Sequence, residues 1–524
     1  MIGHYLCLLA LLQYSLPEQC ITLSSVVVVP LINLAKAMAM ASANVLLLPE
    51  AGSGHLMSLI EAGKRLLAHG GRGDGEGPAV TVTVLVVRPA TSESAAEVDA
   101  HVGRVEASGL GVRFHRLPAV EPPPMGCAAG NVQEFKSRYM QLQAPHVRAA
   151  AAELGAAALV VDFFATGVLD AAREAGVPTY VYFTSTAALL ALMLRLPALE
   201  EEVPVDFEEF DGTVDVPGLP PVPAGSLPAF MGRKESPNFK WFLYHGRRFM
   251  DADGIIINTV AELEPALLAA IADGRCVPGR TAPPLYPIGP VLDLEDKPSS
   301  NARCVRWLDA QPPASVLFLC FGSMGWFDAA KAREVAAGLE RSGHRFLWAL
   351  RGPPAAGTVH PTDASLDELL PEWFLERTKG RGLVWPTWAP QKEILAHAAI
   401  GSFVTHCGWN STLESLWHGV PLVPWPLYAE QRLNAFELVR DMGVAVPLGV
   451  DGKRRDSFVE AAELERAVRS LMDDASEVGR KVREKAAEMK AVCRNAVAPG
   501  GGSSYAALQR LLGAIRGGFS TMTQ

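Results

Sequence analysis

The chain has 524 residues, more than one hydrophobic core usually supports, which favours two domains. Its net charge of −9 argues against a nucleic-acid partner, because phosphate binding needs a basic surface. No apolar run is long enough to predict an integral membrane segment, and the eight scattered cysteines suit reduced thiols in the cytoplasm.

Residues 1–43 precede the first clear alternation of strands and helices, and we predict that they form an extension outside the fold. Residues 5–12 are as apolar as a short signal-peptide core, but no Lys or Arg precedes them. Pro30 and Lys36 interrupt the apolar stretch that follows. A signal peptide or a membrane-associating segment stays open as the alternative.

Residues 44–287 alternate short apolar strands with helical stretches, which predicts a first domain of parallel βαβ units. After the first strand, apolar residues recur at helical spacing from Leu56 to Leu67. A Pro-rich and acidic stretch at 199–228 is expected to be a surface loop. The predicted strands are 45–48, 80–87, 158–161, 179–183 and 254–258.

Residues 288–302 predict a linker, because Pro, Asp and Ser replace the apolar periodicity there. The βα pattern restarts in a second domain at 303–495, and 496–524 predict a C-terminal helix and tail. The fold class is therefore α/β, with two Rossmann-like domains facing across a cleft. Such domains place a ligand at the carboxyl ends of their strands.

Residues 388–431 carry the strongest functional pattern. A strand at 402–405 leads through a turn into a helix predicted to begin near Asn410, and free N–H groups at a helix start can bind a diphosphate. Glu414 lies on the same helix face and can accept hydrogen bonds from a ribose. Trp388 offers a flat ring for a base, and Gln391 an amide for the nucleoside.

This segment resembles the plant secondary-product signature of family 1 UDP-dependent glycosyltransferases, a fixed span of 44 residues with Trp388 and Gln431 at its two ends. The likeness extends from Asn44 to about Ile515. It implies the GT-B arrangement of the two domains and a UDP-sugar as co-substrate.

Matched position by position, the resemblance implies three sets of donor-binding residues. Uracil and ribose would contact Trp388, Ala389, Gln391 and Glu414. The diphosphate would contact Ser323, His406, Asn410 and Ser411. The sugar would contact Trp409, Glu430 and Gln431, and Thr184 from the first domain. Many members have Asp at the position of Glu430, and a Gln at the position of Gln431 is associated with glucose donors.

His55 and Asp162 are the candidate catalytic pair. His55 follows the turn after the first strand, and Asp162 follows the 158–161 strand, so both should face the cleft. From the residues alone, a single His at a helix start is often only a cap. The resemblance implies that His55 is the general base, that Asp162 orients it, and that one displacement inverts the anomeric carbon.

No metal or other cofactor is expected. The only Asp-x-Asp string, Asp251 to Asp253, is better explained as a solvated turn, and His406-Cys407 lacks a second ligand pair for zinc. The resemblance is closest to the branch acting on flavonoids and other phenolics. The aromatic and thioether side chains that could line an acceptor pocket, although each is more often a core residue, are Met125, Phe163, Phe164, Tyr182 and Phe183.

Three other functions stay open at this point. A catalytically silent nucleotide-sugar-binding protein would keep residues 388–431 but lose His55 or Asp162, and both are present. A UDP-sugar hydrolase or epimerase could use the same fold. A dinucleotide oxidoreductase is disfavoured, because the turn from Gly52 to Gly54 lacks the third Gly of that fingerprint. We expect a monomer.

Overall fold

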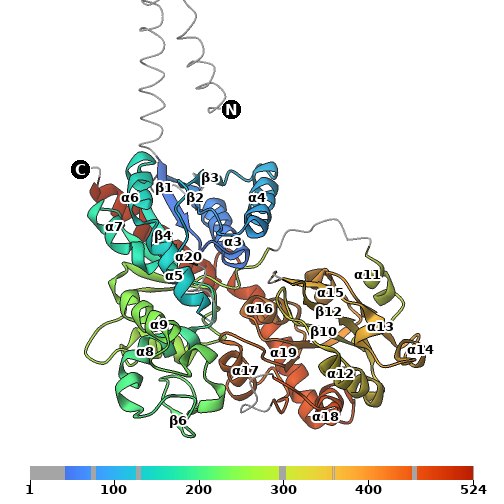
Figure 1. Ribbon diagram of the computed structural model, residues 1–524. Helices are drawn as coiled ribbons and strands as arrows, with labels where there is room; N and C mark the ends of the chain where they lie inside the picture. Colours follow the sequence, from blue (N-terminus) through green and yellow to red (C-terminus); the bar gives the residue numbers. More distant parts are fainter. Residues whose placement is uncertain are drawn as a thin grey trace, which may run out of the picture.

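The structure is a computed structural model that describes residues 42–71, 78–124, 131–293, 302–356, 358, 360–450 and 457–522. The predicted extension therefore lies outside the described residues up to residue 41, and its last two residues, Ser42 and Ala43, already belong to the first strand. Figure 1 shows two lobes, one built mainly from the blue to green part of the chain and one from the yellow to red part.

The first lobe contains a seven-stranded sheet in the order β3-β2-β1-β4-β5-β8-β9. Each neighbouring pair is parallel, as the alternation of strands and helices predicted. The strands are β1 (Ser42–Leu48), β2 (Ala79–Val86), β3 (Arg113–Arg116), β4 (Ala156–Asp162), β5 (Thr179–Phe183), β8 (Gly254–Ile257) and β9 (Leu285–Pro287).

Helices cover both faces of this sheet because side chains alternate along each strand. Val45 and Leu47 of β1 pack with one set of helices, whereas Leu46 and Leu48 pack with the other. The first set is α3 (Ser53–Gly70), α4 (Ser92–Ala107) and α20 (Ser503–Met522). The second set includes α5 (Val132–Gln141), α6 (Ala144–Glu153), α7 (Leu169–Glu174), α8 (Ala187–Glu202), α9 (Pro237–Arg248) and α10 (Pro265–Ala272).

The second lobe contains a five-stranded parallel sheet in the order β14-β11-β10-β15-β16. Its strands are β10 (Val316–Cys320), β11 (Arg345–Ala349), β14 (Gly382–Trp385), β15 (Ile400–Thr405) and β16 (Leu422–Pro424). Its principal helices are α11 (Arg303–Leu308), α12 (Ala329–Ser342), α15 (Gln391–Ala396), α16 (Trp409–His418), α17 (Gln431–Arg440), α18 (Ala461–Met472) and α19 (Glu477–Ala496). Among the described residues, none of the helices has the length and apolar character needed to span a membrane.

The stretch 199–228 is not the loose surface loop that its composition predicted. It begins inside α8 and contains a small antiparallel pair, β6 (Thr213–Val214) and β7 (Val222–Pro223). Phe207, Val216 and Leu227 are buried in the core of the first lobe. The prediction missed these buried side chains because they stand singly between polar residues and prolines, so no periodic pattern reveals them.

The helix α20 returns from the second lobe to the first sheet. Leu508, Leu511 and Ile515 are buried with the residues of β1 and α3. The Arg516 guanidinium donates hydrogen bonds to the backbone oxygens of Gly70, at 3.1 Å, and Pro78, at 3.2 Å. In Figure 1 this red helix lies beside β4, among blue and cyan elements. The predicted C-terminal helix therefore packs on the first domain.

Two buried carboxyl groups meet where α8 and α17 pack between the lobes. Glu264 accepts a hydrogen bond from Ala188 N–H, at 2.9 Å, and another from the Thr259 hydroxyl. Glu437 is fully buried, and its carboxyl group shares a hydrogen bond with the carboxyl group of Glu264. Burial raises the pKa of Glu437, and the nearby charge of Glu264 raises it further.

We expect Glu437→Gln to stabilise the protein at alkaline pH and to have little effect at low pH. The raised folded-state pKa gives the wild type stability below the ordinary glutamate pKa of about 4.3, and this stability is lost as pH rises through the folded-state value. The glutamine has no such titration, so a gain of about 1–3 kcal/mol is expected at pH 8. Thermal unfolding at pH 5 and pH 8 measures it, with the exposed Glu488→Gln as control. A variant less stable than wild type at pH 8 contradicts the prediction.

Candidate active site

A cavity of about 670 Å³ lies at the carboxyl ends of β10, β11 and β14. Most of its lining comes from the second lobe, but Met57 of α3 and Leu292 also contribute. The predicted donor-binding residues that line it are Ser323, Trp388, Ala389, Gln391, Ser411 and Glu414. The cavity thus brings Ser323, from the turn after β10, to five residues of the 388–431 segment.

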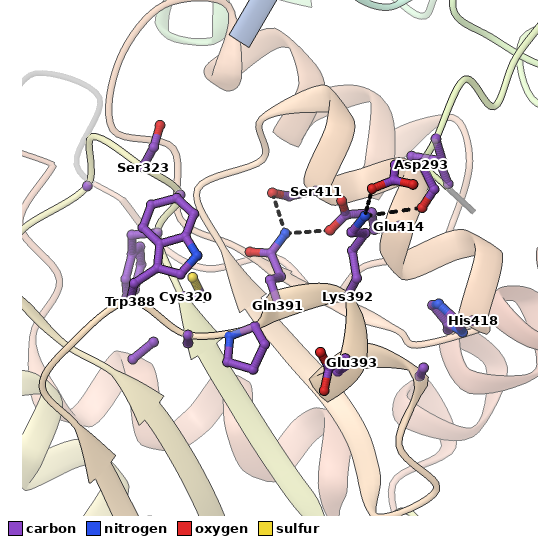
Figure 2. Close-up of a pocket in the computed structure, with 18 of the residues that line it drawn as sticks. Asp293, Cys320, Ser323, Trp388, Gln391, Lys392, Glu393, Ser411, Glu414 and His418 are labelled. Carbon is purple, nitrogen blue, oxygen red and sulfur yellow. Dashed lines mark hydrogen bonds and ion pairs between the residues drawn. The ribbon is translucent and has the colours of Figure 1, made fainter. Parts of the chain in front are cut away.

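The end of the cavity that is predicted to hold the nucleoside contains Trp388, Gln391 and Glu414. Trp388 is 66% exposed, and its backbone oxygen accepts a hydrogen bond from the Trp385 indole at 3.1 Å. One face of an indole is thereby open to a base. The Gln391 amide donates to Glu414 at 2.7 Å and to the Ser411 hydroxyl at 2.9 Å, as Figure 2 shows.

The contact between Gln391 and Glu414 uses the atoms that the resemblance assigns to the ribose. Burial raises the pKa of Glu414, and the hydrogen bond from Gln391 opposes this effect. A ribose hydroxyl that donates to Glu414 would therefore compensate the same buried carboxylate. On the far side of Glu414, Lys392 forms an ion pair with Asp293 at 2.6 Å (Figure 2), which ties the second lobe to the end of the first.

His406, which is predicted to contact the diphosphate, lies just before the start of α16. The helix begins at Trp409 with Gly408 as its N-cap, slightly before the predicted start at Asn410. The imidazole lies between two glycines: a Cβ atom would come within 2.6 Å of its Nε2 at Gly322 and within 2.4 Å at Gly408. Burial lowers the pKa of His406 to about 4, so the ring is neutral at physiological pH and has one N–H to donate.

The remaining predicted diphosphate residues surround this helix start. Ser411 is buried at the cavity wall, and Ser323 is exposed in the turn after β10. Asn410 is exposed, and its side-chain oxygen lies 3.5 Å from the amide nitrogen of Asn258. His406 and Asn410 are not among the residues that line the cavity, so their predicted contacts stay predictions.

Trp409 takes a different position from the one expected for a sugar-binding side chain. Its indole is buried, and the indole nitrogen donates to the backbone oxygen of Asn258 at 2.6 Å. Since this nitrogen is the only polar atom of the side chain, no indole donor is left for a sugar hydroxyl. Trp409 instead connects the helix start to the first lobe, and only its backbone is available to a donor.

Glu430 and Gln431 stand at the start of α17 and face the first lobe. The Ser185 hydroxyl donates to Glu430 at 3.3 Å, next to the half-buried Thr184 that follows β5. The Gln431 side-chain oxygen accepts from the N–H groups of Leu427, at 2.8 Å, and Tyr428, at 3.0 Å. Gln431 is buried, and these two hydrogen bonds fix the orientation of its amide group.

His55 and Asp162 come together at the carboxyl ends of the neighbouring strands β1 and β4. His55 belongs to the first turn of α3, and its Nδ1 lies 2.7 Å from the Asp162 carboxylate at the end of β4. Asp162 is fully buried and also accepts a hydrogen bond from Phe164 N–H at 2.9 Å. Burial alone lowers the pKa of His55, but the charge and hydrogen bond of Asp162 outweigh burial and raise it.

The aromatic residues predicted for an acceptor pocket divide into two groups. The rings of Phe163 and Phe164 lie 5.5 Å and 5.6 Å from the imidazole of His55. Tyr182 and Phe183 are fully buried core residues, and the Tyr182 hydroxyl lies 2.8 Å from that of Ser58. Met125 lies outside the described residues.

Two residues at this interface escaped the sequence analysis. Asn258 contacts both Trp409 and Asn410, and its side-chain oxygen accepts from Val291 N–H at 2.7 Å. Ser185 contacts Glu430. Asn258 directly follows β8, and Ser185 stands two residues after the end of β5, so a search for polar residues near strand ends would have included both. Asp253, in contrast, accepts from Thr179 N–H at 2.8 Å, so it has a structural role at the start of β5.

Comparisons with known proteins agree on one family. Residues 282–479 match the family described as UDP-glucoronosyl and UDP-glucosyl transferase. The chain is 60% identical to the malvidin galactosylase of Oryza sativa subsp. japonica over 90% of its own length and 97% of the relative's. Together with the fold, this identity shows that the chain belongs to the same family as the rice protein.

Two solved structures extend the comparison to bound ligands. A glycosyltransferase of Medicago truncatula complexed with UDP-glucose is 35% identical, with a TM-score of 0.76 over 91% of this chain and 99% of that one. A Phytolacca americana enzyme complexed with UDP-2fluoro-glucose and pterostilbene is 32% identical, with a TM-score of 0.75 over 90% and 99%.

Proposed function

Because the chain belongs to plant family 1 of the UDP-dependent glycosyltransferases, we propose that it moves a hexose from a UDP-sugar to a hydroxyl of a flavonoid-like phenol and forms a β-O-glycoside. The observation that carries this proposal is the contact between His55 and Asp162 at 2.7 Å, because a silent binding protein has no need for an oriented base.

The proposed chemistry is a single displacement. Asp162 holds the His55 Nδ1–H, which leaves Nε2 as the atom that accepts the proton of the acceptor hydroxyl. The acceptor oxygen then forms a bond to the anomeric carbon, while the bond to the UDP oxygen breaks and its electron pair leaves with UDP. One displacement inverts the anomeric carbon, so an α-linked donor gives a β-glycoside.

The second lobe would hold the donor and stabilise the leaving group. Trp388 would stack on uracil, and Glu414 would accept the ribose hydroxyls after exchange with Gln391. The helix start of α16 and the neutral His406 would hold the diphosphate. Because this set of donors can bind the developing charge of UDP, we propose that transfer requires no metal.

The choice of hexose rests on two observations that differ. Gln431 favours glucose by resemblance to the family, and the Medicago structure holds UDP-glucose, whereas the relative from rice is a galactosylase. The two hexoses differ only in the configuration at C4. We propose glucose as the donor sugar, with galactose as the competitor that the experiment includes. The acceptor class is supported by malvidin and pterostilbene in the names of the relatives.

Two further properties complete the proposal. A monomer is sufficient, because the catalytic pair and the donor cavity lie within one chain. The cytoplasm is the proposed location, because the cysteines are not grouped as a disulfide framework.

The proposal is tested by incubating the purified chain with UDP-glucose or UDP-galactose, a panel of flavonoids and stilbenes, and EDTA. UDP release, product mass and the anomeric proton coupling of the product are measured. We expect a β-glycoside in the presence of EDTA, with a larger kcat/KM for UDP-glucose. UDP release without acceptor would indicate a hydrolase, interconversion of the two UDP-hexoses an epimerase, and UDP binding without any product a silent binding protein.

A further inference from the structure

An ion pair that the proposed chemistry does not use lies beside the catalytic histidine. Glu50 follows β1, and its side chain is only 5% exposed. Lys136 of α5 reaches it from another part of the first lobe, with Nζ 3.0 Å from the carboxylate. A buried carboxylate is costly unless a cation compensates it, so this pair is not an ordinary surface contact.

Glu50 is attached to the turn that carries His55. The N–H of Gly52, which caps α3, hydrogen-bonds to the Glu50 carboxylate. A Cβ atom at Gly52 would lie only 2.7 Å from the same carboxylate, so the glycine allows the acid to sit directly against the backbone. His55 stands in the helical turn that begins immediately afterwards. The position of Glu50 therefore constrains the approach of the chain to the catalytic base.

Lys136 connects the same pair to the aromatic wall beside His55. Its Nζ lies 5.7 Å from the centre of the Phe164 ring, within the range of a cation–π contact. The Phe164 ring is in turn 5.6 Å from the imidazole. The carboxylate, the ammonium, the aromatic ring and the imidazole thus form one continuous group, contributed by the turn after β1, by α5, by the 3-10 helix η4 (Phe163–Val168) and by α3.

The charges in this group act on the imidazole with opposite signs. Besides Asp162, three charged groups influence His55: Glu50, Lys136, and Glu430 at the start of α17. Glu50 raises the pKa of His55 and Lys136 lowers it, so the two effects oppose each other when the pair is intact. Removal of either partner would leave the other charge uncompensated beside the base.

We propose that Glu50 and Lys136 are positioning residues for His55: Glu50 fixes the turn before the base, and Lys136 cancels its charge so that Asp162 sets the protonation of the imidazole. This proposal rests on the proposed function, because the ion pair matters for catalysis only if His55 is the base. The proposal also predicts how the titration of the His55 ring changes, which can be measured without any reaction.

The test compares Glu50→Gln, Lys136→Met and the double variant by the pH dependence of kcat/KM. The acceptor is a phenol with a pKa near 10, so that the acid limb reports His55. We expect the acid limb to move down by about half a unit in Glu50→Gln, up by a similar amount in Lys136→Met, and back near wild type in the double variant. Lys136→Arg should keep the wild-type limb, because it keeps the charge.

Arg138→Met is the matched control. Arg138 lies on the same helix, and its ion pair with Glu134 at 2.8 Å is separate from the contacts of Lys136 with Glu50 and Phe164. This variant loses the same charge and should leave the acid limb unchanged. A lower kcat or a lower unfolding temperature without opposite shifts of the acid limb in the two single variants would overturn the proposal. Loss of a merely structural ion pair would not shift the acid limb in opposite directions.

Titration of the His55 ring by NMR in the ligand-free protein separates this proposal from the proposed function. His55→Ala identifies the resonance, and the same opposite shifts are expected in the absence of donor and acceptor. If the shifts occur and no sugar is transferred, the function fails and the pair stands. If sugar is transferred and neither titration curve moves, the pair fails and the function stands.

Discussion

His55→Ala should lower kcat by about 10²–10⁴-fold while UDP binding stays at the wild-type level. The imidazole is the group proposed to take the acceptor proton, and it does not line the donor cavity. Asp162→Asn should lower kcat to a similar degree, because an amide cannot hold the same tautomer of His55 as the carboxylate. Since Asp162 raises the pKa of His55, the acid limb of kcat/KM should also move to lower pH in this variant.

The chain contains a close control for this experiment. His344 forms a second histidine–aspartate contact with Asp473, also at 2.7 Å, and its side chain is 23% exposed compared with 24% for His55. His344→Ala should change neither kcat nor UDP affinity. Steady-state kinetics and calorimetry with UDP measure both properties. If His55→Ala kept a tenth or more of the wild-type kcat, His55 would not be the base.

Gly322→Ala should weaken UDP binding by about 10–100-fold, the cost of losing a hydrogen bond to a charged group. The new Cβ atom would stand 2.6 Å from the His406 Nε2, so the imidazole would have to leave its place between the two glycines. The backbone at Gly322 also has a φ of +74°, which strains an alanine. His406→Ala should weaken binding to a similar degree if the displaced imidazole is the cause.

Gly443→Ala separates the steric effect from the strain. Gly443 has a similar φ of +66°, but no atom lies within 4 Å of the Cβ position. It should therefore lose stability by about 1 kcal/mol and keep the wild-type affinity for UDP. Calorimetry with UDP and thermal unfolding distinguish the two outcomes. If Gly322→Ala kept the wild-type affinity for UDP, His406 would not belong to the diphosphate site.

The sequence predicted those parts of the molecule that depend on local pattern. The prediction of parallel strands was correct because each strand is a short apolar run ended by a turn. The carboxyl ends of such strands meet at one edge of the sheet. For the same reason, His55 and Asp162 could be expected to meet, although they are far apart in the sequence. The cavity unites Trp388, Gln391 and Glu414 because all three belong to one contiguous segment.

Contacts that join distant elements could not be predicted in this way. Nothing in the sequence around Lys136 indicates that it pairs with Glu50, because their meeting depends on how α5 packs against η4 and α9. The hydrogen bond from the Trp409 indole to Asn258 could not be predicted for a similar reason, because Asn258 belongs to the first lobe and lies far from Trp409 in the sequence. The buried pair of Glu264 and Glu437 likewise exists only once both lobes have packed.

The return of α20 to the first sheet has a consequence for biosynthesis. The ribosome completes the second lobe before it releases the residues that cover β1 and α3, including Leu508 and Leu511. The first lobe must therefore wait with part of its apolar surface open, in spite of being made first. Chaperones that bind exposed hydrophobic surface should contact the nascent first lobe until α20 emerges.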